Sequence, residues 1–145
     1  MVAPHPEGEG AYLAMKNALR NAGISAEEVD VITAHATSTI AGDRAETLAI
    51  IKMLGEHAYQ IPVTANKSML GHMFGAAGGV EAIALVKTLI EGIIPATINL
   101  EQADAECDLD YVPNVARETQ MNIGLSNSFG FGGHNAVIVL KRYEG

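Results

Sequence analysis

The amino-acid sequence predicts an α/β domain whose sheet mixes parallel and antiparallel strands. Segments with apolar residues at helical spacing alternate with short apolar segments over the first two thirds of the chain, and the last third is mainly typical of strands. The length of 145 residues suits a single domain with its own hydrophobic core. Hydrophobic residues make up 48% and charged residues 18%, a balance that favours a globular protein and argues against disorder.

The first predicted elements lead to a histidine. A helix is expected over residues 9–21, where small and apolar side chains recur at helical spacing, and Gly23 is expected to end it. Residues 29–32 predict a short strand that is covered on both faces. The segment 33–39 follows, so that His35 is expected at the strand end or in the loop beyond it, where functional groups of α/β proteins often lie.

The middle of the chain combines a glycine-rich loop with an unusually apolar helix. A second helix is expected over residues 44–54 and a short strand over residues 61–64. The loop 65–79 then leads into a helix over residues 80–90, which carries apolar residues on every side. Such a helix must be buried all round, so we expect it in an inner layer between two sheets.

The end of the chain is predicted to form strands around a glycine-rich turn. The glycines of residues 127–135 allow a tight turn and a close approach of the backbone to a ligand. The polar, acidic segment 101–110 is the candidate linker. The predicted strands are residues 96–100, 109–112, 121–129 and 135–140.

Charge and cysteine content exclude several classes of function. Seventeen acidic residues against nine basic ones give a net charge of −8, which makes the chain a poor binder of nucleic acid. No run approaches the ~18 apolar residues that a transmembrane helix needs, so no membrane partner is predicted. Because Cys107 is the only cysteine, an internal disulfide is impossible, and a reducing, cytoplasmic location is expected.

The N-terminal segment lacks the features of a signal peptide. It has neither a basic region nor an apolar core, and Pro4, Pro6, Gly8 and Gly10 are typical of an interior loop that leads into a helix. We therefore expect this chain to be a truncated or proteolysed piece of a larger protein.

Two of the five histidines, His35 and His72, stand out by their surroundings of Gly, Ala, Ser and Thr. A neutral imidazole there can donate a hydrogen bond to a carbonyl or an enolate, or act as an acid or base. Spacing alone slightly favours the alternative that both are loop histidines serving as caps. None of the histidines occurs in an HExxH or Cys-x-x-Cys pattern, so no zinc site is predicted.

Four further residues have both a functional and a structural interpretation. Lys67 either biases the protonation of His72 or holds a carboxylate, or else it is solvated. Glu81 either meets a partner, with Lys67 as the first candidate, or is favoured by the helix dipole. Thr37 and Thr39 either bind a ligand amide or cap the following turn. Cys107 lies between two acidic residues that would raise its thiol pKa, which predicts a structural role.

Three segments together resemble the β-ketoacyl-[acyl-carrier-protein] synthase II family of condensing enzymes, specifically its C-terminal half. The resemblance covers about residues 3–142. It rests on long motifs in the right order: Ala34-His-Ala-Thr-Ser-Thr with Gly42-Asp43, Lys67-Ser-Met with Gly71-His72 and Gly75-Ala-Ala-Gly, and Asn127-Ser-Phe-Gly-Phe-Gly-Gly with Asn135. The segment Cys107-Asp-Leu-Asp-Tyr-Val-Pro is also similar.

The resemblance implies one half of a thiolase-like αβαβα layered sandwich, with residues 1–145 as the C-terminal domain. The family joins an acyl group to malonyl-carrier protein by decarboxylative Claisen condensation and needs no further cofactor. It implies that His35 and His72 act on the malonyl thioester, supported by Lys67 and Glu81. It also implies that Phe131 is the gating residue and contributes a backbone N–H to the oxyanion hole. Two threonines, Thr37 and Thr39, are expected to bind the pantetheine arm.

The chain also departs from the family pattern. The nucleophilic cysteine belongs to the N-terminal half, which has no counterpart here, so the isolated chain is expected to be inactive. Alanine replaces the usual glycine at position 36, and histidine replaces the usual threonine at position 134. Hydroxyl residues around Lys67 are replaced by Asn66 and Leu70.

These observations favour an enzyme half that works with acyl-carrier protein and the missing N-terminal half. The alternative is a non-catalytic partner that binds a ketosynthase half or acyl chains. Half of a sandwich should expose the surface that meets its partner, so we expect dimers or higher oligomers.

Overall fold

The computed structural model describes residues 5–143, except for the side chain of Phe131. Four of its strands form one mixed sheet, in the order β2-β1-β5-β6. These are β1 (Val31–Thr33), β2 (Val63–Thr64), β5 (Ile123–Phe129) and β6 (Asn135–Lys141). Strand β1 runs parallel to β2 and to β5, and β6 is antiparallel to β5. The predicted mixed sheet is therefore confirmed.

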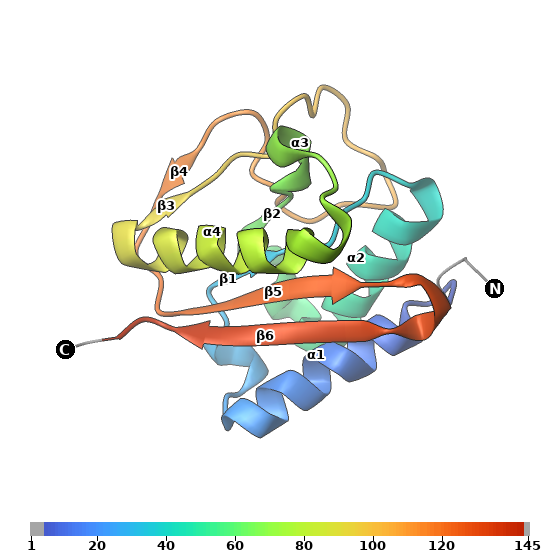
Figure 1. Cartoon of the computed structure of the whole chain (residues 1–145), viewed down its shortest axis with the longest axis horizontal. Coiled ribbons are helices and arrows are strands. Elements are labelled where there is room, and N and C mark those ends of the chain that lie inside the picture. Colours follow the sequence, from blue (N-terminus) through green and yellow to red (C-terminus); the bar gives the residue numbers. More distant parts are fainter. Residues whose placement is uncertain (1–4, 144–145) are drawn as a thin grey trace.

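Helices cover both faces of this sheet (Figure 1). Helices α1 (Glu9–Ala22) and α2 (Ile40–Leu54) pack together on one face, and α4 (Ala77–Glu91) packs on the other. Neighbouring residues of β1 divide between the two cores, because Ile32 joins the α1–α2 side and Val31 joins Leu85 and Leu89 of α4.

Helix α4 lies unusually close to strand β5. A Cβ atom added to Gly124 would lie 2.6 Å from Leu85 Cδ1, so a larger residue there would displace the Leu85 side chain. The helix buries its inner side, which includes Leu85, Leu89 and Glu81, but Ile83 and Ile90 are 65% and 63% exposed. The expectation that this helix is buried all round is therefore wrong for these 145 residues alone.

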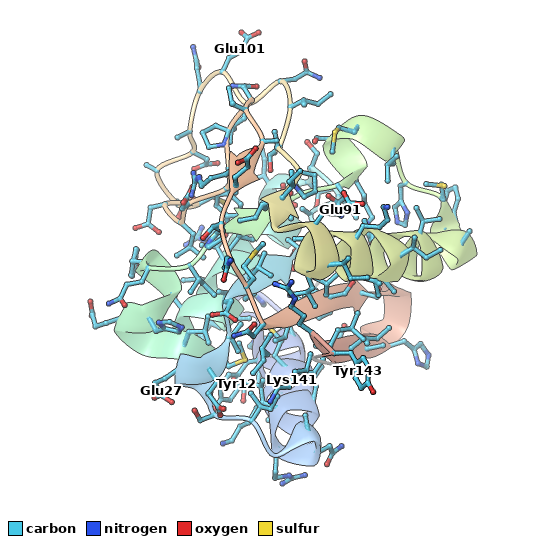
Figure 2. The ribbon with its side chains drawn as sticks, turned by 90° about the vertical axis from the view of Figure 1, so that its left-hand side faces the viewer. Tyr12, Glu27, Glu91, Glu101, Lys141 and Tyr143 are labelled. Atoms are coloured by element: carbon cyan, nitrogen blue, oxygen red, sulfur yellow. The ribbon has the colours of Figure 1, made fainter. Side chains whose placement is uncertain are left out.

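The predicted strands 96–100 and 109–112 are not strands. Positive φ angles at Asn99 (61°) and Val112 (49°) turn the chain out of the extended conformation. The second sheet is instead the short antiparallel pair of β3 (Ile93–Ile94) and β4 (Arg117–Glu118). Between them runs a long loop with Glu101 at its outer tip (Figure 2).

Short helical segments join the main elements. Helix α3 (Lys67–Leu70) follows β2, and single 3₁₀ turns span Ala26–Glu28, Gly55–Tyr59, Phe74–Ala76 and Phe131–Gly133. No helix among residues 5–143 is long and apolar enough to cross a membrane.

Candidate active site

The fold brings His35 and His72 together at one edge of the sheet. His35 follows β1, and His72 lies in the loop after α3, which itself follows β2. Because β1 and β2 are parallel neighbours, their carboxyl ends lie at the same edge. The centroids of the two imidazole rings are 5.6 Å apart, with the rings edge to face.

A buried carboxylate, Glu46 of α2, fixes the backbone at His35 and at the next residue, Ala36. The N–H of His35 donates to Glu46 Oε1 and the N–H of Ala36 donates to Oε2, both at 2.9 Å. The amide of Asn127 on β5 also donates to Oε1, at 3.0 Å. Burial raises the pKa of Glu46, and these donors oppose the rise by favouring its charged form.

The environment of His35 keeps its ring neutral. Burial, together with the nearby positive charge of Lys67 and the neighbouring His72, lowers the pKa of His35 to about 4. The ring of Phe129 lies 5.8 Å from it, centroid to centroid. At neutral pH this imidazole is therefore uncharged and available for a hydrogen bond to a ligand.

A backbone contact determines which nitrogen of His72 carries the proton. The N–H of Phe74 donates to His72 Nδ1 at 3.2 Å, so the neutral ring holds its hydrogen on Nε2. The ring of Phe74 stacks on His72 at 5.1 Å between centroids and 19° between planes. The Nε2–H of this exposed histidine is thus oriented as a donor.

Lys67 and Glu81 form a buried ion pair beside the histidines. Lys67 Nζ donates to Glu81 Oε1, and the side chains are only 6% and 3% exposed. The prediction that Glu81 meets a partner, with Lys67 as the first candidate, is confirmed. The alternative of a solvated Lys67 is wrong, because the side chain is only 6% exposed and its ammonium group pairs with Glu81 of α4.

The structure gives different outcomes for the remaining candidate residues. Thr39 caps α2, since its hydroxyl accepts the N–H of Gly42 at 3.2 Å, whereas Thr37 is half-buried in the same loop. The side chain of Phe131 lies outside the described residues. Burial raises the pKa of the Cys107 thiol, and the acidic residues around it raise it further, which agrees with the predicted direction.

Four contributors to the site were missed in the sequence. A signal existed for Glu46, which shares the inner side of α2 with Ala45, Ala49 and Ile50, where an acid needs partners. Contacts between distant segments reveal Asn127 and Phe129, and Phe74 is revealed by its contacts with His72, two residues before it.

The geometry suits the stabilisation of negative charge on an oxygen atom. The two imidazoles lie together at one edge of the sheet, and His72 presents an Nε2–H. Preorganised donors of this kind stabilise a developing oxyanion or enolate.

Comparison with known proteins decides the family. Residues 1–101 match the family described as "Beta-ketoacyl synthase, C-terminal domain". The chain belongs to the β-ketoacyl synthase family. The 3-oxoacyl-[acyl-carrier-protein] synthase 2 of Synechocystis sp. is 51% identical over 144 residues, which cover 99% of this chain and 35% of that protein. Its counterpart from Coxiella burnetii is 53% identical over 142 residues, which cover 98% and 34%. This β-ketoacyl synthase chain thus spans about a third of the curated relatives that it matches.

Solved ketosynthase structures share the fold. The ishigamide ketosynthase/chain length factor superposes with a TM-score of 0.93 at 41% identity, over 99% of this chain and 34% of that one. A type II PKS acyl-carrier protein in complex with its ketosynthase gives a TM-score of 0.97 at 36% identity, over 99% and 35%. The predicted thiolase-like α/β fold is confirmed.

Proposed function

We propose that this β-ketoacyl synthase chain supplies the malonyl-side half of a 3-oxoacyl-[acyl-carrier-protein] synthase of fatty-acid elongation. The observation that carries the proposal is the pair of imidazoles, 5.6 Å apart, with a hydrogen of His72 on Nε2. Residues 1–145 act as the C-terminal domain, and a separate N-terminal half carries the nucleophilic cysteine.

The two histidines act on the malonyl thioester. When its C–CO₂⁻ bond breaks, CO₂ leaves and the bonding pair forms an enolate, whose oxygen becomes negative. Hydrogen bonds from His35 and His72 stabilise that oxygen. The enolate carbon then attacks the acyl thioester on the cysteine of the other half, and the cysteine thiolate leaves. A neutral His35 suits this role, since its pKa of about 4 keeps it uncharged in the cell.

The other site residues position substrate and histidines. The buried Lys67–Glu81 pair holds the second loop against α4. The hydroxyl of Thr39 can still donate to a pantetheine amide while it caps α2, and Thr37 lies in the same loop. We assign Phe131 to the gate and to the oxyanion hole.

Acyl-carrier protein is the proposed source of both thioesters. Support comes from the solved structure of an acyl-carrier protein in complex with its ketosynthase, which resembles this chain at a TM-score of 0.97. The isolated chain is proposed to lack condensing activity, because its single cysteine, Cys107, is half-buried with a raised pKa.

A chimera tests the catalytic proposal. This chain would replace the matching third of the Synechocystis synthase, and condensation of acyl- with malonyl-carrier protein would be measured. We expect an active chimera, and H35A and H72A should each lower kcat by at least ~100-fold, the loss typical for one oxyanion donor. The control H5A changes an exposed histidine and should leave activity unchanged.

Two results would contradict the proposal. If the H35A and H72A chimeras remain as active as H5A, the histidines do not carry the reaction. If this chain binds a separately made N-terminal half without restoring any condensation, the non-catalytic binding partner is the better interpretation.

A further inference from the structure

Phe74, in the loop that carries His72, has a backbone conformation that is unusual for its residue type. Its φ is +49°, in the left-handed region that bulky residues rarely adopt. Gly75 stands next to it but is not among the residues with positive φ, so the loop places its left-handed residue on a phenylalanine although a glycine follows directly. Such a strained residue persists only where its surroundings hold it, and strained residues cluster at functional sites.

Two contacts join Phe74 to one side chain, His72. The Phe74 N–H donates to His72 Nδ1 at 3.2 Å, which closes a turn like those that Asn and Asp side chains make with the backbone two residues on. The phenyl ring stacks on the imidazole, at 5.1 Å between centroids and 19° between planes. Aromatic pairs at this separation are favourable beyond the apolar area that they bury. The stack therefore offsets the strain of the positive φ.

The same two contacts fix the orientation of the imidazole. The torsion about the Cβ–Cγ bond of a histidine is broad, so an unsupported ring turns easily. The hydrogen bond to Nδ1 holds the ring at its edge and the phenyl ring covers one of its faces, so rotation about that bond would disturb both contacts. His35 meets the fixed ring edge to face, at 87° between planes. The direction of the His72 Nε2–H thus depends on Phe74.

We propose that Phe74 is a positioning residue for His72: its ring stabilises the left-handed turn, and the turn orients the Nε2–H of the imidazole. The backbone N–H alone does not suffice. Every residue except proline has this N–H, but only a residue that is stable at positive φ presents it to Nδ1. The consequence for catalysis rests on the proposed function of His72, whereas the positioning itself can be tested without any activity.

Three variants separate the ring from the backbone. F74Y keeps the ring. F74A removes the ring and leaves a residue that resists positive φ, whereas F74G removes the ring and adopts positive φ freely. The measurement is the NMR scalar coupling across the hydrogen bond, between the amide nitrogen of residue 74 and His72 Nδ1, in the isotope-labelled 145-residue chain. It would be made at about pH 8, above the usual pKa of histidine, so that Nδ1 is free to accept.

We expect the coupling in the unmodified chain and in F74Y, a smaller coupling in F74G, and none in F74A. Because Phe74 is 79% exposed in this chain, far-UV circular dichroism should be the same for all four proteins. A coupling that F74A retains in full would overturn the proposal, since the ring would then not be needed. A coupling that is absent from F74G as well would overturn the link between the ring and the positive φ.

The chimera with the Synechocystis synthase measures the consequence for catalysis. F74A should lower kcat ~10- to 100-fold, because a misdirected donor stabilises the enolate less, and F74Y should recover most of that loss. If F74A loses the coupling but its chimera keeps full kcat, the proposed function of His72 is wrong and the contact with Phe74 stands. If F74A keeps the coupling, the positioning role is wrong whatever its kcat.

Discussion

The alanine at position 36 provides a sharp test of how the histidine loop is built. Ala36 has a φ of +36°, a conformation that glycine adopts without strain and alanine does not. Its N–H must nevertheless point at Glu46 Oε2, at 2.9 Å, to hold the loop beside His35. Substitution A36G should therefore relax the backbone and keep the hydrogen bond.

The size of the effect follows from three terms. Relief of the left-handed conformation is worth about 1–2 kcal/mol. The greater freedom of glycine in the unfolded chain costs about 0.4–1 kcal/mol. Loss of a half-buried methyl group at Ala36 removes about 0.4 kcal/mol, half of the value for a buried carbon. The net expectation for A36G is a small stabilisation, about 0.5 kcal/mol.

Ala34 is the matched control, because it is 1% exposed and is not among the residues with positive φ. A34G loses a fully buried methyl group and gains the same unfolded-state freedom, so it should destabilise the chain by about 1.5 kcal/mol. The two variants should differ by about 2 kcal/mol in urea unfolding and by about 6 °C in Tm. If A36G destabilises the chain as much as A34G does, the strain assigned to Ala36 is absent and the reasoning fails.

Three further predictions concern the buried polar groups of the site. E46A should lower the free energy of unfolding by about 3 kcal/mol, measured in urea, because it leaves three donors without an acceptor, whereas E46Q should lose less. K67M should cost about 3–5 kcal/mol by stranding Glu81, and the double variant K67M/E81L should recover most of it in a double-mutant cycle. The folded-state pKa of His35, about 4, lies below its usual 6.5, so the unfolded state binds the proton more readily and stability should fall as the pH drops from 6.5 to 4. H35N should flatten that part of the pH profile, and an unchanged slope would count against a neutral, buried ring.

The sequence predicted those parts of the fold that depend on local pattern. Helix α1 and strands β5 and β6 lie within a few residues of the predicted bounds, because regular apolar spacing and glycine breaks mark them. The two strands predicted between residues 96 and 112 failed, since Asn99 and Val112 adopt positive φ. Apolar β-branched residues such as Val112 give no local sign of that turn, which its neighbours impose: the N–H of Thr97 donates to the Val112 carbonyl at 2.9 Å.

The site residues, too, divide into those that local motifs predict and those that only the folded structure brings together. Short motifs identified His35, His72 and the pair of Lys67 with Glu81, which the fold brings together. Glu46 was missed because its partners lie on two separate segments, residues 35–36 and strand β5, and become visible only when β5 is placed beside β1. A side chain whose hydrogen-bond partners are distant in the sequence has no fixed sequence spacing to them from which its role could be predicted.

Helix α4 supports the site with one side and is open on the other. Glu81 points inward to Lys67, whereas Ile83, two positions further along the chain, is 65% exposed. One short segment therefore holds the second histidine loop with one side and offers apolar surface with the other. A partner that covered the exposed side would restrict the motion of α4 and so hold the Lys67–Glu81 pair in place.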